Sequence, residues 1–327
     1  MKLLVTGGAG FIGSNFVHYM LNRYPNYQII NVDLLTYAGN MDNLSGVEGD
    51  ARHSFFKADI ADPIAMGQIF EQEIDAIINF AAESHVDRSI EQPEIFIHSN
   101  IQGTQNLLNL SLKHKVKKYI QVSTDEVYGT LGDEGLFTES SPIAPNSPYS
   151  ATKAGADLLV RAYHETYSLS VNITRCSNNY GPFQFPEKLI PLMIQNALSD
   201  NFLPVYGDGL NIRDWLYVED HCSAIDLVLH KGVNGEIYNV GGNNERTNIA
   251  VVKKILSELN KPETLINYVT DRLGHDRRYA INADKIRREL GWKPMYDYES
   301  GISTTVKWYL SNQKWMQRIA SGAYRGQ

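Results

Sequence analysis

Short apolar runs recur through the first half of the chain, separated by segments with a helical spacing of apolar residues. Each run is four or five residues long, which is typical of a strand buried on both faces of a sheet. The runs are Lys2 to Thr6, Gln28 to Val32, Ser54 to Lys57, Ala76 to Phe80, Tyr119 to Val122 and Val171 to Arg175. Strands that alternate with helices predict an α/β fold built on a doubly wound parallel sheet, the Rossmann architecture.

The regular alternation ends after Gly181, where prolines at 182, 186, 191 and 204 interrupt the chain. Residues 203–214 are rich in glycine and predict a loop, whereas 234–241 predict a strand returning to the main sheet and 246–260 predict a helix. We therefore expect a Rossmann domain of residues 1–178 plus about 211–247, and a smaller C-terminal α/β substrate lobe of about 179–210 and 248–327. The active site is expected in the cleft between them.

A glycine-rich turn follows the first predicted strand. Gly7, Gly10 and Gly13 stand three residues apart, directly before a helical segment from Ser14 to Leu21. Glycines at this spacing allow a tight turn, close approach of the backbone to a pyrophosphate, and close packing of helix on strand. The second predicted strand ends at Asp33, twenty residues beyond Gly13. A carboxylate there binds the adenosine ribose hydroxyls and repels a 2′-phosphate, so the pattern predicts NAD rather than NADP as cofactor.

Polar residues also follow the later predicted strands, at the carboxyl ends where ligands of this architecture bind. They are Asp59-Ile60, Ala81-Ala82-Glu83-Ser84, Ser123-Thr124-Asp125-Glu126 and Asn178-Asn179-Tyr180. The alternative for Asp59 or Ser84 is a cap on the helix that follows. Their common position favours one shared site.

Tyr149 and Lys153 are one helical turn apart, which places the phenol and the ammonium on the same face. A positive charge beside the phenol favours the phenolate, so Tyr149 can act as a base at neutral pH. Asp125 and Glu126 bring the candidate proton carriers to three, whereas a simple alcohol dehydrogenase needs one. The site is therefore predicted to do more than a single oxidation.

The 327-residue chain is 43% hydrophobic, enough for a sizeable core, and its net charge of −7 argues against a nucleic-acid partner. The first apolar run breaks at glycines within seven residues, and no apolar stretch approaches the length of a membrane span. We therefore expect a cytoplasmic protein without a signal peptide or membrane contact. Cys176 and Cys222 suit small packing residues better than a disulfide framework or a metal site.

These motifs resemble the extended short-chain dehydrogenase/reductase family, whose members modify nucleotide sugars, and the similarity runs essentially from end to end. The matching stretches are Thr6 to Gly13, Asp33, Ser123 to Gly129 and Tyr149 to Lys153. Thr36 to Asn40, Ser123 to Gly129 and Arg272 to Tyr279 are similar to the members that dehydrate a nucleotide-activated hexose. The adjacent Asp125-Glu126 is the most specific of these features, because the family's epimerases need no acid and base for an elimination.

The resemblance implies dTDP-glucose as the substrate and a reaction that begins with oxidation at C4. Tyr149 would take the C4 hydroxyl proton while NAD receives the hydride, Thr124 would bond the C4 oxygen, and Lys153 would tune Tyr149 and hold the nicotinamide ribose. Glu126 would then remove the C5 proton. Asp125, kept protonated by burial beside Glu126, would protonate the departing C6 hydroxyl. Return of the hydride to C6 gives a 4-keto-6-deoxy sugar, as in deoxysugar (for example rhamnose) biosynthesis, and regenerates a tightly bound NAD.

The resemblance also implies the remaining binding residues. Those around the cofactor are Gly7, Gly10, Phe11, Ile12, Gly13, Asp33, Leu34, Leu35, Thr36, Asp59, Ile60, Ala81, Ala82, Ser99, Tyr149, Lys153 and Asn179. Those around the substrate are Ser84, Thr124, Asn178, Lys188, Leu189, Pro204, Val205, Tyr206, Arg213, Asn248, Arg272 and His275. Arg213 and Arg272 would meet the diphosphate, and an ion pair with Asp214 is the alternative for Arg213. No metal is expected.

Two helical segments, Ile101 to Leu112 and the helix that begins near Tyr149, carry apolar residues around more of their circumference than one sheet contact buries. With the family resemblance, this predicts a homodimer through a four-helix interface, the alternative being that the second lobe covers these faces.

Other functions remain open at this point. The chain can be another nucleotide-sugar enzyme of the family, such as a 4-epimerase, a GDP-mannose dehydratase or a decarboxylase. It can also be a noncatalytic NAD-binding sensor, although a sensor has no need of Asp125, Glu126, Tyr149 and Lys153 together.

Overall fold

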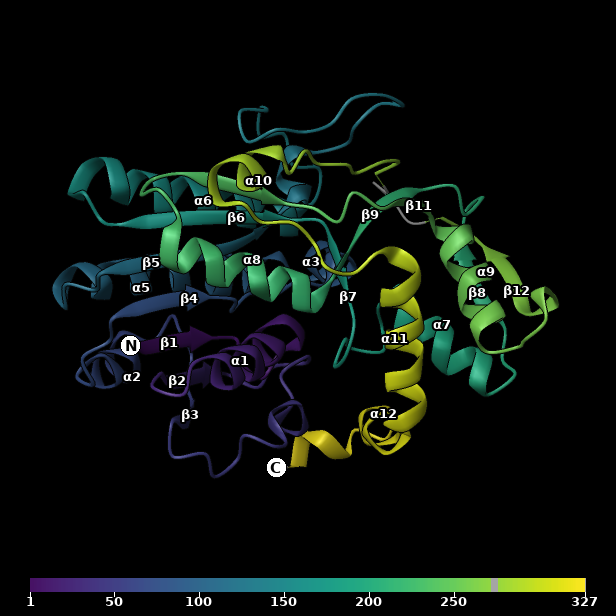
Figure 1. Cartoon of the computed structure of the whole chain (residues 1–327), viewed down its shortest axis with the longest axis horizontal. Coiled ribbons are helices and arrows are strands. Elements are labelled where there is room, and N and C mark those ends of the chain that lie inside the picture. Colours follow the sequence, from purple (N-terminus) through teal and green to yellow (C-terminus); the bar gives the residue numbers. More distant parts are fainter. Residues whose placement is uncertain (272–275, 327) are drawn as a thin grey trace.

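In a computed structural model, which describes residues 1–271 and 276–326, a seven-stranded parallel sheet forms the centre of the first lobe (Figure 1). The strands lie in the order β10-β6-β5-β4-β1-β2-β3. They are β1 (Lys2–Thr6), β2 (Gln28–Asp33), β3 (His53–Lys57), β4 (Ala76–Asn79), β5 (Lys118–Thr124), β6 (Val171–Cys176) and β10 (Ile237–Val240). All neighbouring strands pair in parallel. From β1 the chain adds β2 and β3 on one side of the sheet, and β4, β5, β6 and β10 on the other, so the strand order switches between β1 and β4. The predicted doubly wound Rossmann sheet is confirmed.

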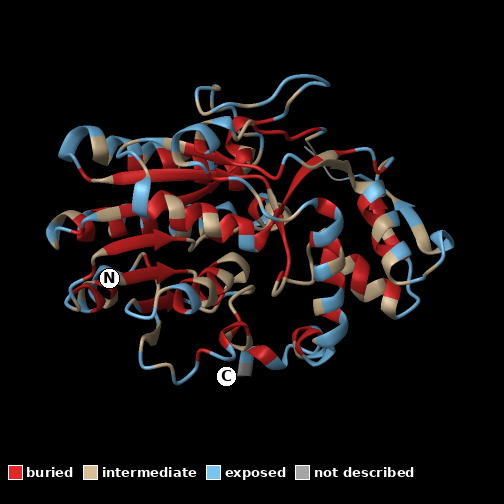
Figure 2. Cartoon of the chain, in the orientation of Figure 1, coloured by how far each residue is buried: buried red, intermediate tan, exposed pale blue. Residues whose placement is uncertain are grey.

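Helices cover both faces of this sheet. The helices α1 (Phe11–Arg23), α8 (Val218–Lys231) and α10 (Asp284–Leu290) close one core, which includes Phe16, Ile225 and Ile286. The helices α2 (Pro63–Phe70), α5 (Gly103–Lys113) and α6 (Pro148–Tyr167) close the other, which includes Met66, Leu107 and Val160. The inner strands are buried along their length, as continuous apolar runs require (Figure 2).

The six predicted strands of the first lobe lie within two residues of their expected bounds, and the predicted return strand is β10, which pairs with β6. Among these six strands the largest difference is at β5, which was expected to end at Val122 and continues to Thr124. As a result Ser123 and Thr124 are the last residues of a central strand, and the site begins directly after them.

The second lobe lies beyond the carboxyl ends of the sheet (Figure 1). Its elements are α7 (Leu189–Leu198), β8 (Leu203–Tyr206), α9 (Asn248–Glu258), β12 (Ile266–Val269), α11 (Tyr298–Ser311) and α12 (Gln313–Ala320). They enclose a separate core that includes Met193, Ile255, Ile302 and Trp315. A small sheet of β11 (Glu245–Thr247), β9 (Ile212–Tyr217) and β7 (Asn178–Tyr180) joins the lobes.

The prediction of a loop over residues 203–214 is wrong. The strand β8 pairs in parallel with β12, far downstream in the sequence, and β9 pairs with both β7 and β11. The glycines mark only the turn between β8 and β9, where Gly207 and Gly209 have φ of +58° and +72°. The helix expected from Arg246 begins at Asn248, because Arg246 pairs with Arg213 in the small sheet.

The chain returns to the first lobe after the second lobe has begun. Within the stretch assigned to the substrate lobe, Ile286 of α10 and Trp292 pack into the same core as Leu3 and Val5 of β1. Residues near 284–292 therefore pack with the sheet of the first lobe, although they lie within the range 248–327 that was assigned to the second lobe. Figure 1 shows α10 beside α8.

The remaining elements are short helices. They are η1 (Met41–Leu44), α3 (Val86–Glu91), α4 (Pro93–Phe96), the π-helix η2 (Ile97–Gln102), η3 (Asp125–Tyr128), η4 (Glu263–Leu265) and η5 (Ala323–Gly326). Among the described residues, no helix combines the length and the apolar character that crossing a bilayer demands.

Candidate active site

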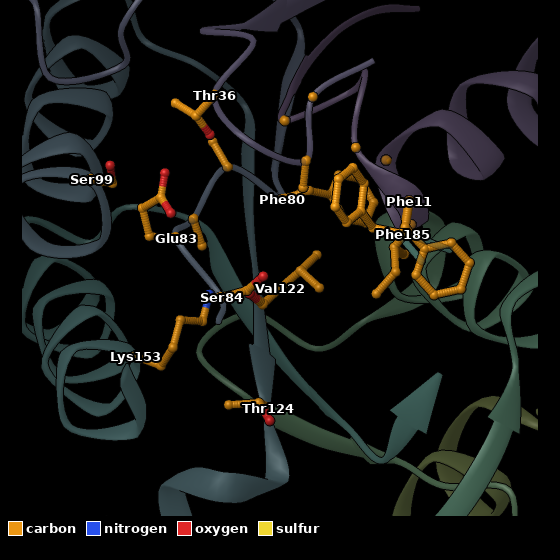
Figure 3. Close-up of a pocket in the computed structure, with 18 of the residues that line it drawn as sticks. Phe11, Thr36, Phe80, Glu83, Ser84, Ser99, Val122, Thr124, Lys153 and Phe185 are labelled. Carbon is orange, nitrogen blue, oxygen red and sulfur yellow. The ribbon is translucent and has the colours of Figure 1, made fainter. Parts of the chain in front are cut away.

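A cleft of about 320 Å³ opens at the carboxyl ends of the central strands (Figure 3). The predicted site residues that line it are Gly7, Gly10, Phe11, Ile12, Gly13, Asp33, Leu34, Thr36, Asp59, Ile60, Ala81, Ala82, Ser84, Ser99, Thr124, Asp125, Glu126, Tyr149, Lys153, Asn178, Asn179 and Lys188. They come from strands far apart in the sequence, so the fold brings the cofactor motif and the proton carriers into one cavity.

The turn from β1 to α1 is shaped by its glycines. A Cβ on Gly13 would lie 2.2 Å from the carbonyl oxygen of Gly7, and one on Gly7, whose φ is +69°, would lie 2.6 Å from the backbone nitrogen of Ala81. A Cβ on Gly10 would meet only the Gly7 carbonyl oxygen, at 3.2 Å, and Gly10 lines the cleft. The turn therefore leaves the N-terminus of α1 open to a pyrophosphate, whose charge the helix dipole favours.

Asp33 is fixed at the end of β2 before any ligand arrives. One carboxylate oxygen accepts the Ala9 N–H at 3.0 Å, and the other accepts the Leu35 N–H at 2.8 Å. Burial raises the pKa of Asp33, and these backbone bonds oppose the rise. Each oxygen keeps a further lone pair for a ribose hydroxyl, so the residue fits the adenosine end of NAD. Leu34, directly after it, is exposed at the cleft.

Helix capping does not explain Asp59 or Ser84. The cap of α2 is Asp62, and the cap of α3 is His85. Asp59 instead accepts the Ala61 N–H at 2.8 Å and contacts the His98 ring nitrogen at 2.8 Å. Ser84 lies 3.3 Å from the Tyr37 hydroxyl and accepts the Lys188 ammonium at its carbonyl oxygen, at 3.4 Å.

The acid and base candidates occupy the first turn of η3, immediately after β5. The Thr124 hydroxyl accepts the Glu126 N–H at 3.3 Å and donates to Asp125 at 3.4 Å. Asp125 is 2% exposed, and its second oxygen has no hydrogen-bond partner among the described residues. Burial, then the charges of Glu126 and Asp214, hold the pKa of Asp125 well above its ordinary value. Asp125 can therefore keep a proton near neutrality and act as an acid.

The start of α6 aims Tyr149 at the cleft. Ser147 and Ser150 form a reciprocal capping box, in which the Ser147 hydroxyl accepts the Ser150 N–H at 3.1 Å, and Pro148 occupies the first helical position. Tyr149 and Lys153 lie one turn apart and are 8% and 4% exposed. Both line the cleft, as the spacing predicts.

The electrostatics of this pair differ from the expectation. Burial, followed by the charge of Glu126, raises the pKa of Tyr149 well above its ordinary value, and a hydrogen bond from Thr124 opposes the rise. The Lys153 ammonium donates to the Val122 carbonyl oxygen at 2.7 Å, and Figure 3 shows the side chain reaching toward that strand. Burial lowers the pKa of Lys153, and the charge of Asp157 opposes that fall. In this state the phenolate is not favoured.

The lip of the cleft carries charged residues that the sequence did not single out. Glu187 lies 3.4 Å from the His85 ring nitrogen and 3.9 Å from the Lys188 ammonium. Burial raises the pKa of Glu187, whereas Lys188 lowers it. Glu83 and Tyr37 line the same region. Only weak indications of these residues are present in the sequence: Glu187 precedes Lys188, a predicted substrate-binding residue, and Tyr37 lies in the stretch Thr36 to Asn40 that resembles the family.

Several predicted binding residues do not line the cleft. Leu35, Leu189, Asn248 and the stretch 204–206 lie outside its lining, and Val205 packs in the second core, so only its backbone can face a ligand. Arg213 is buried near Asp125, donates to the Asp276 carbonyl oxygen at 2.9 Å and lies 4.5 Å from the Tyr279 ring centre. Asp214 accepts backbone N–H groups of Gly242 and Asn244. Arg272 and His275 lie outside the described residues.

Both cysteines are buried and free. Cys222 packs in the first core, whereas Cys176 also lines the cleft, and burial raises the pKa of its thiol to about 12. Such a thiol is a packing residue rather than a nucleophile. Among the described residues, no group of three or more His, Cys, Asp or Glu side chains is arranged to hold a metal ion.

The chain matches the family model described as GDP-mannose 4,6 dehydratase over residues 4–305. The dTDP-glucose 4,6-dehydratase of Xanthomonas campestris pv. campestris (strain B100) is 55% identical, over 98% of this chain and 97% of the relative. The crystal structure of dTDP-glucose 4,6-dehydratase from Bacillus anthracis str. Ames in complex with NAD is 54% identical, with a TM-score of 0.92 over 98% of this chain and 99% of that chain. The enzyme of the same name from Streptomyces venezuelae, with NAD and TYD bound, is 50% identical, with a TM-score of 0.94 over 98% of this chain and 100% of that chain.

These similarities span nearly the whole of each protein, and the residues that carry the resemblance in the sequence converge in one cleft. The chain therefore belongs to the nucleotide-sugar 4,6-dehydratase family, the branch of the extended short-chain dehydrogenase/reductases to which its motifs pointed.

Proposed function

We propose that the protein is an NAD-dependent hydro-lyase, a dTDP-glucose 4,6-dehydratase, which converts dTDP-D-glucose to dTDP-4-keto-6-deoxy-D-glucose and water. The observation that carries this function is the buried Asp125, which lies beside Glu126 in the same cleft as Tyr149 and whose pKa burial raises well above its ordinary value. An acid and a base side by side are what an elimination across C5 and C6 requires. An epimerase has no use for them.

The chain's own residues divide the proton transfers. Tyr149 accepts the proton of the C4 hydroxyl as a phenolate, which the positive charges of Lys153 and of a bound nicotinamide would favour, and Thr124 bonds the C4 oxygen. Glu126 removes the C5 proton, which a neighbouring ketone acidifies, and Asp125 protonates the departing C6 hydroxyl. Glu126 then returns a proton to C5 as C6 is reduced, which completes the 4-keto-6-deoxy product. When bound, NAD supplies a hydride acceptor that becomes the hydride donor later in the same turnover. Gly7, Gly10, Gly13 and Asp33 would hold it, with Lys153 at the nicotinamide ribose.

The substrate would lie across both lobes. Support comes from Lys188 and Asn178, which line the cleft, and from Arg213, a buried cation near Asp125. The Streptomyces venezuelae dTDP-glucose 4,6-dehydratase, which has NAD and TYD bound, supports dTDP-glucose as the substrate. The exposed Tyr206 offers an aromatic face for the base.

Incubation of the purified protein with dTDP-glucose, without added reductant, tests the function. The expected product is the 4-keto-6-deoxy nucleotide sugar, seen by its alkali-induced absorbance and by mass spectrometry as substrate less one water. UDP-glucose and GDP-mannose serve as competing substrates. Formation of the C4 epimer without loss of water, or loss of water only from GDP-mannose, would show that the substrate or reaction is misassigned.

We also infer a homodimer in the cytoplasm, acting in deoxysugar biosynthesis. Leu158 of α6 and Ile97 of η2 are 53% and 47% exposed, which supports an apolar face that the described residues cover only in part. This exposed apolar face is smaller than the sequence predicted, because Leu107, Leu108 and Leu110 of α5 are buried within the chain. Sedimentation equilibrium at micromolar concentration tests the dimer: a species at the 36.8 kDa chain mass, rather than twice that mass, contradicts it.

A further inference from the structure

A buried ion pair lies directly behind the proton carriers. Asp157 stands one turn beyond Lys153 on α6, so Tyr149, Lys153 and Asp157 follow one another along one face of the helix. The Arg175 guanidinium meets the Asp157 carboxylate at 2.9 Å, with side chains 3% and 1% exposed. The established chemistry assigns neither residue a part.

The strands place this pair beside the site. Arg175 is opposite Ser123 in the β5 and β6 pairing, and the next pair along is Thr124 with Cys176. The Arg175 guanidinium carbon also lies 4.8 Å from the Tyr128 ring centre, and the Tyr128 hydroxyl donates to Asn239 at 2.8 Å. Arg175 is therefore enclosed by the strand that ends at Thr124 and by the η3 helix that carries the acid and base.

Stability alone is a weak reason for such a pair. Removing two charges from water costs several kcal/mol per ion, and apolar side chains of similar volume often replace a buried pair without loss. The pair is also incompletely satisfied: the second Asp157 oxygen and the Ser123 hydroxyl have no hydrogen-bond partner among the described residues. The negative charge of Asp157 instead stabilises the neighbouring Lys153 ammonium.

The charges around Lys153 come from three elements. Tyr149 and Asp157 lie on α6, Asp125, Glu126 and Tyr128 on η3, and Arg175 and Cys176 on β6. Among the nearby charged groups, Glu83 lies 3.8 Å from Arg88, Arg88 of α3 also lies over the Tyr37 ring, and His98 of η2 contacts Asp59. Asp157 is thus the carboxylate that acts on Lys153 from behind the cleft.

Arg175 keeps Asp157 able to do this. Burial raises the pKa of Asp157, and Arg175, then Lys153, lower it. The charge of Asp157 in turn opposes the fall that burial imposes on the pKa of Lys153. The ammonium has one hydrogen bond within the described residues, to the Val122 carbonyl oxygen, and that bond alone does not hold a proton on a buried amine.

We propose that Asp157, balanced by Arg175, is a positioning residue that keeps the Lys153 ammonium charged and seated for its work on Tyr149 and on the cofactor. The inference rests on the proposed function for its effect on turnover, and it stands on the three side chains alone for its effect on Lys153.

A titration of Lys153 tests the proposal without turnover. In protein labelled with isotopic lysine, the Lys153 signal is assigned by its loss in Lys153→Met and followed by NMR against pH. We expect it to titrate at lower pH in Asp157→Asn than in the wild type. Asp226→Asn is the matched control, because Asp226 is a buried carboxylate of α8 that pairs with Arg23 at 3.2 Å on the other face of the sheet. It should leave the titration in place.

Turnover gives the second readout. The active form needs charged Lys153, so the fall of kcat at alkaline pH should begin at lower pH in Asp157→Asn than in the wild type. At a fixed pH within that fall, kcat of the variant should be about tenfold lower for each pH unit by which the profile moves. Asp157→Glu should restore the wild-type profile. If the wild type forms no dehydrated product, the proposed function fails, and the NMR titration still decides this inference.

A double variant guards against misfolding. Asp157→Leu with Arg175→Met replaces the ion pair by apolar side chains, which commonly preserves or increases stability. It should fold and still titrate Lys153 at lower pH. An unmoved Lys153 titration in both variants, with only the melting temperature changed, overturns the proposal.

Discussion

The two ends of the cleft are built differently. At the cofactor end, both Asp33 oxygens already accept backbone N–H groups, and glycines set the shape of the turn. At the reaction end, an Asp125 oxygen and the Ser123 hydroxyl have no hydrogen-bond partner among the described residues. Buried polar groups are normally bonded, so such a cluster indicates a site completed by its ligand. At the cofactor end the key carboxylate is already bonded by the backbone, whereas at the reaction end Asp125 keeps an oxygen for a ligand.

The difference extends to the charges. The reaction end raises the pKa of Asp125 and of Tyr149 and lowers the pKa of Lys153, each chiefly through burial. Substitutions there should change rates by orders of magnitude while leaving binding nearly intact. Substitutions at the cofactor end should weaken binding by smaller factors.

Tyr149→Phe should have the largest effect. The change removes the proton acceptor and keeps the ring, so kcat should fall about 10²–10⁴-fold with little change in substrate affinity. Steady-state assays with dTDP-glucose, and binding measured by calorimetry, check it. Tyr163→Phe is the control, because that hydroxyl on the same helix donates to Asn109 at 2.6 Å and does not line the cleft. Near wild-type turnover in Tyr149→Phe contradicts the base assignment.

Glu126→Gln should stop the reaction one step later. Its shape is nearly unchanged, so C4 is still oxidised and reduced nicotinamide accumulates in a single turnover, but the C5 proton stays. Absorbance of the reduced cofactor and deuterium exchange at C5 separate the two steps. Exchange at the wild-type rate means that another group is the base.

Asp125→Asn should slow the loss of water and spare the removal of the C5 proton. The amide cannot deliver a proton to the departing hydroxyl, and a fall in kcat of about 10²-fold or more is expected for a lost general acid. Continued C5 exchange with little product is the diagnostic result. If C5 exchange is lost in Asp125→Asn and persists in Glu126→Gln, the roles of Asp125 and Glu126 are reversed.

The sequence predicted features that depend on local pattern and missed those that depend on distant pairing. The strands of the first lobe are local apolar runs, and β1 was predicted to the residue. The strand β8 was missed because its partner β12 lies far downstream and its own segment is short and flanked by glycines. Local pattern does not specify pairing over such a separation.

The site follows this rule as well. The spacing of Tyr149 and Lys153 and the glycine turn are local, and both lie where the sequence placed them. The bond of Lys153 to Val122 depends on how α6 sits on β5, which no local pattern encodes. The position of Glu187 in the cleft could not be predicted either, because it depends on how the second lobe packs against the first.

Asp33→Ala should have the smallest effect of the series. Loss of hydrogen bonds to a charged group costs roughly 1.5–3 kcal/mol, so NAD should bind about ten- to a hundredfold more weakly. NADP should lose less or gain, because the charge that repels its 2′-phosphate is gone. Asp33→Asn is the matched control: it keeps an acceptor oxygen for the Ala9 or Leu35 N–H and removes the charge. Titration of the cofactor-free protein with both nucleotides gives the ratio of their affinities, which a merely loosened loop does not change. An unaltered ratio in both variants would show that the discrimination lies elsewhere in the cleft.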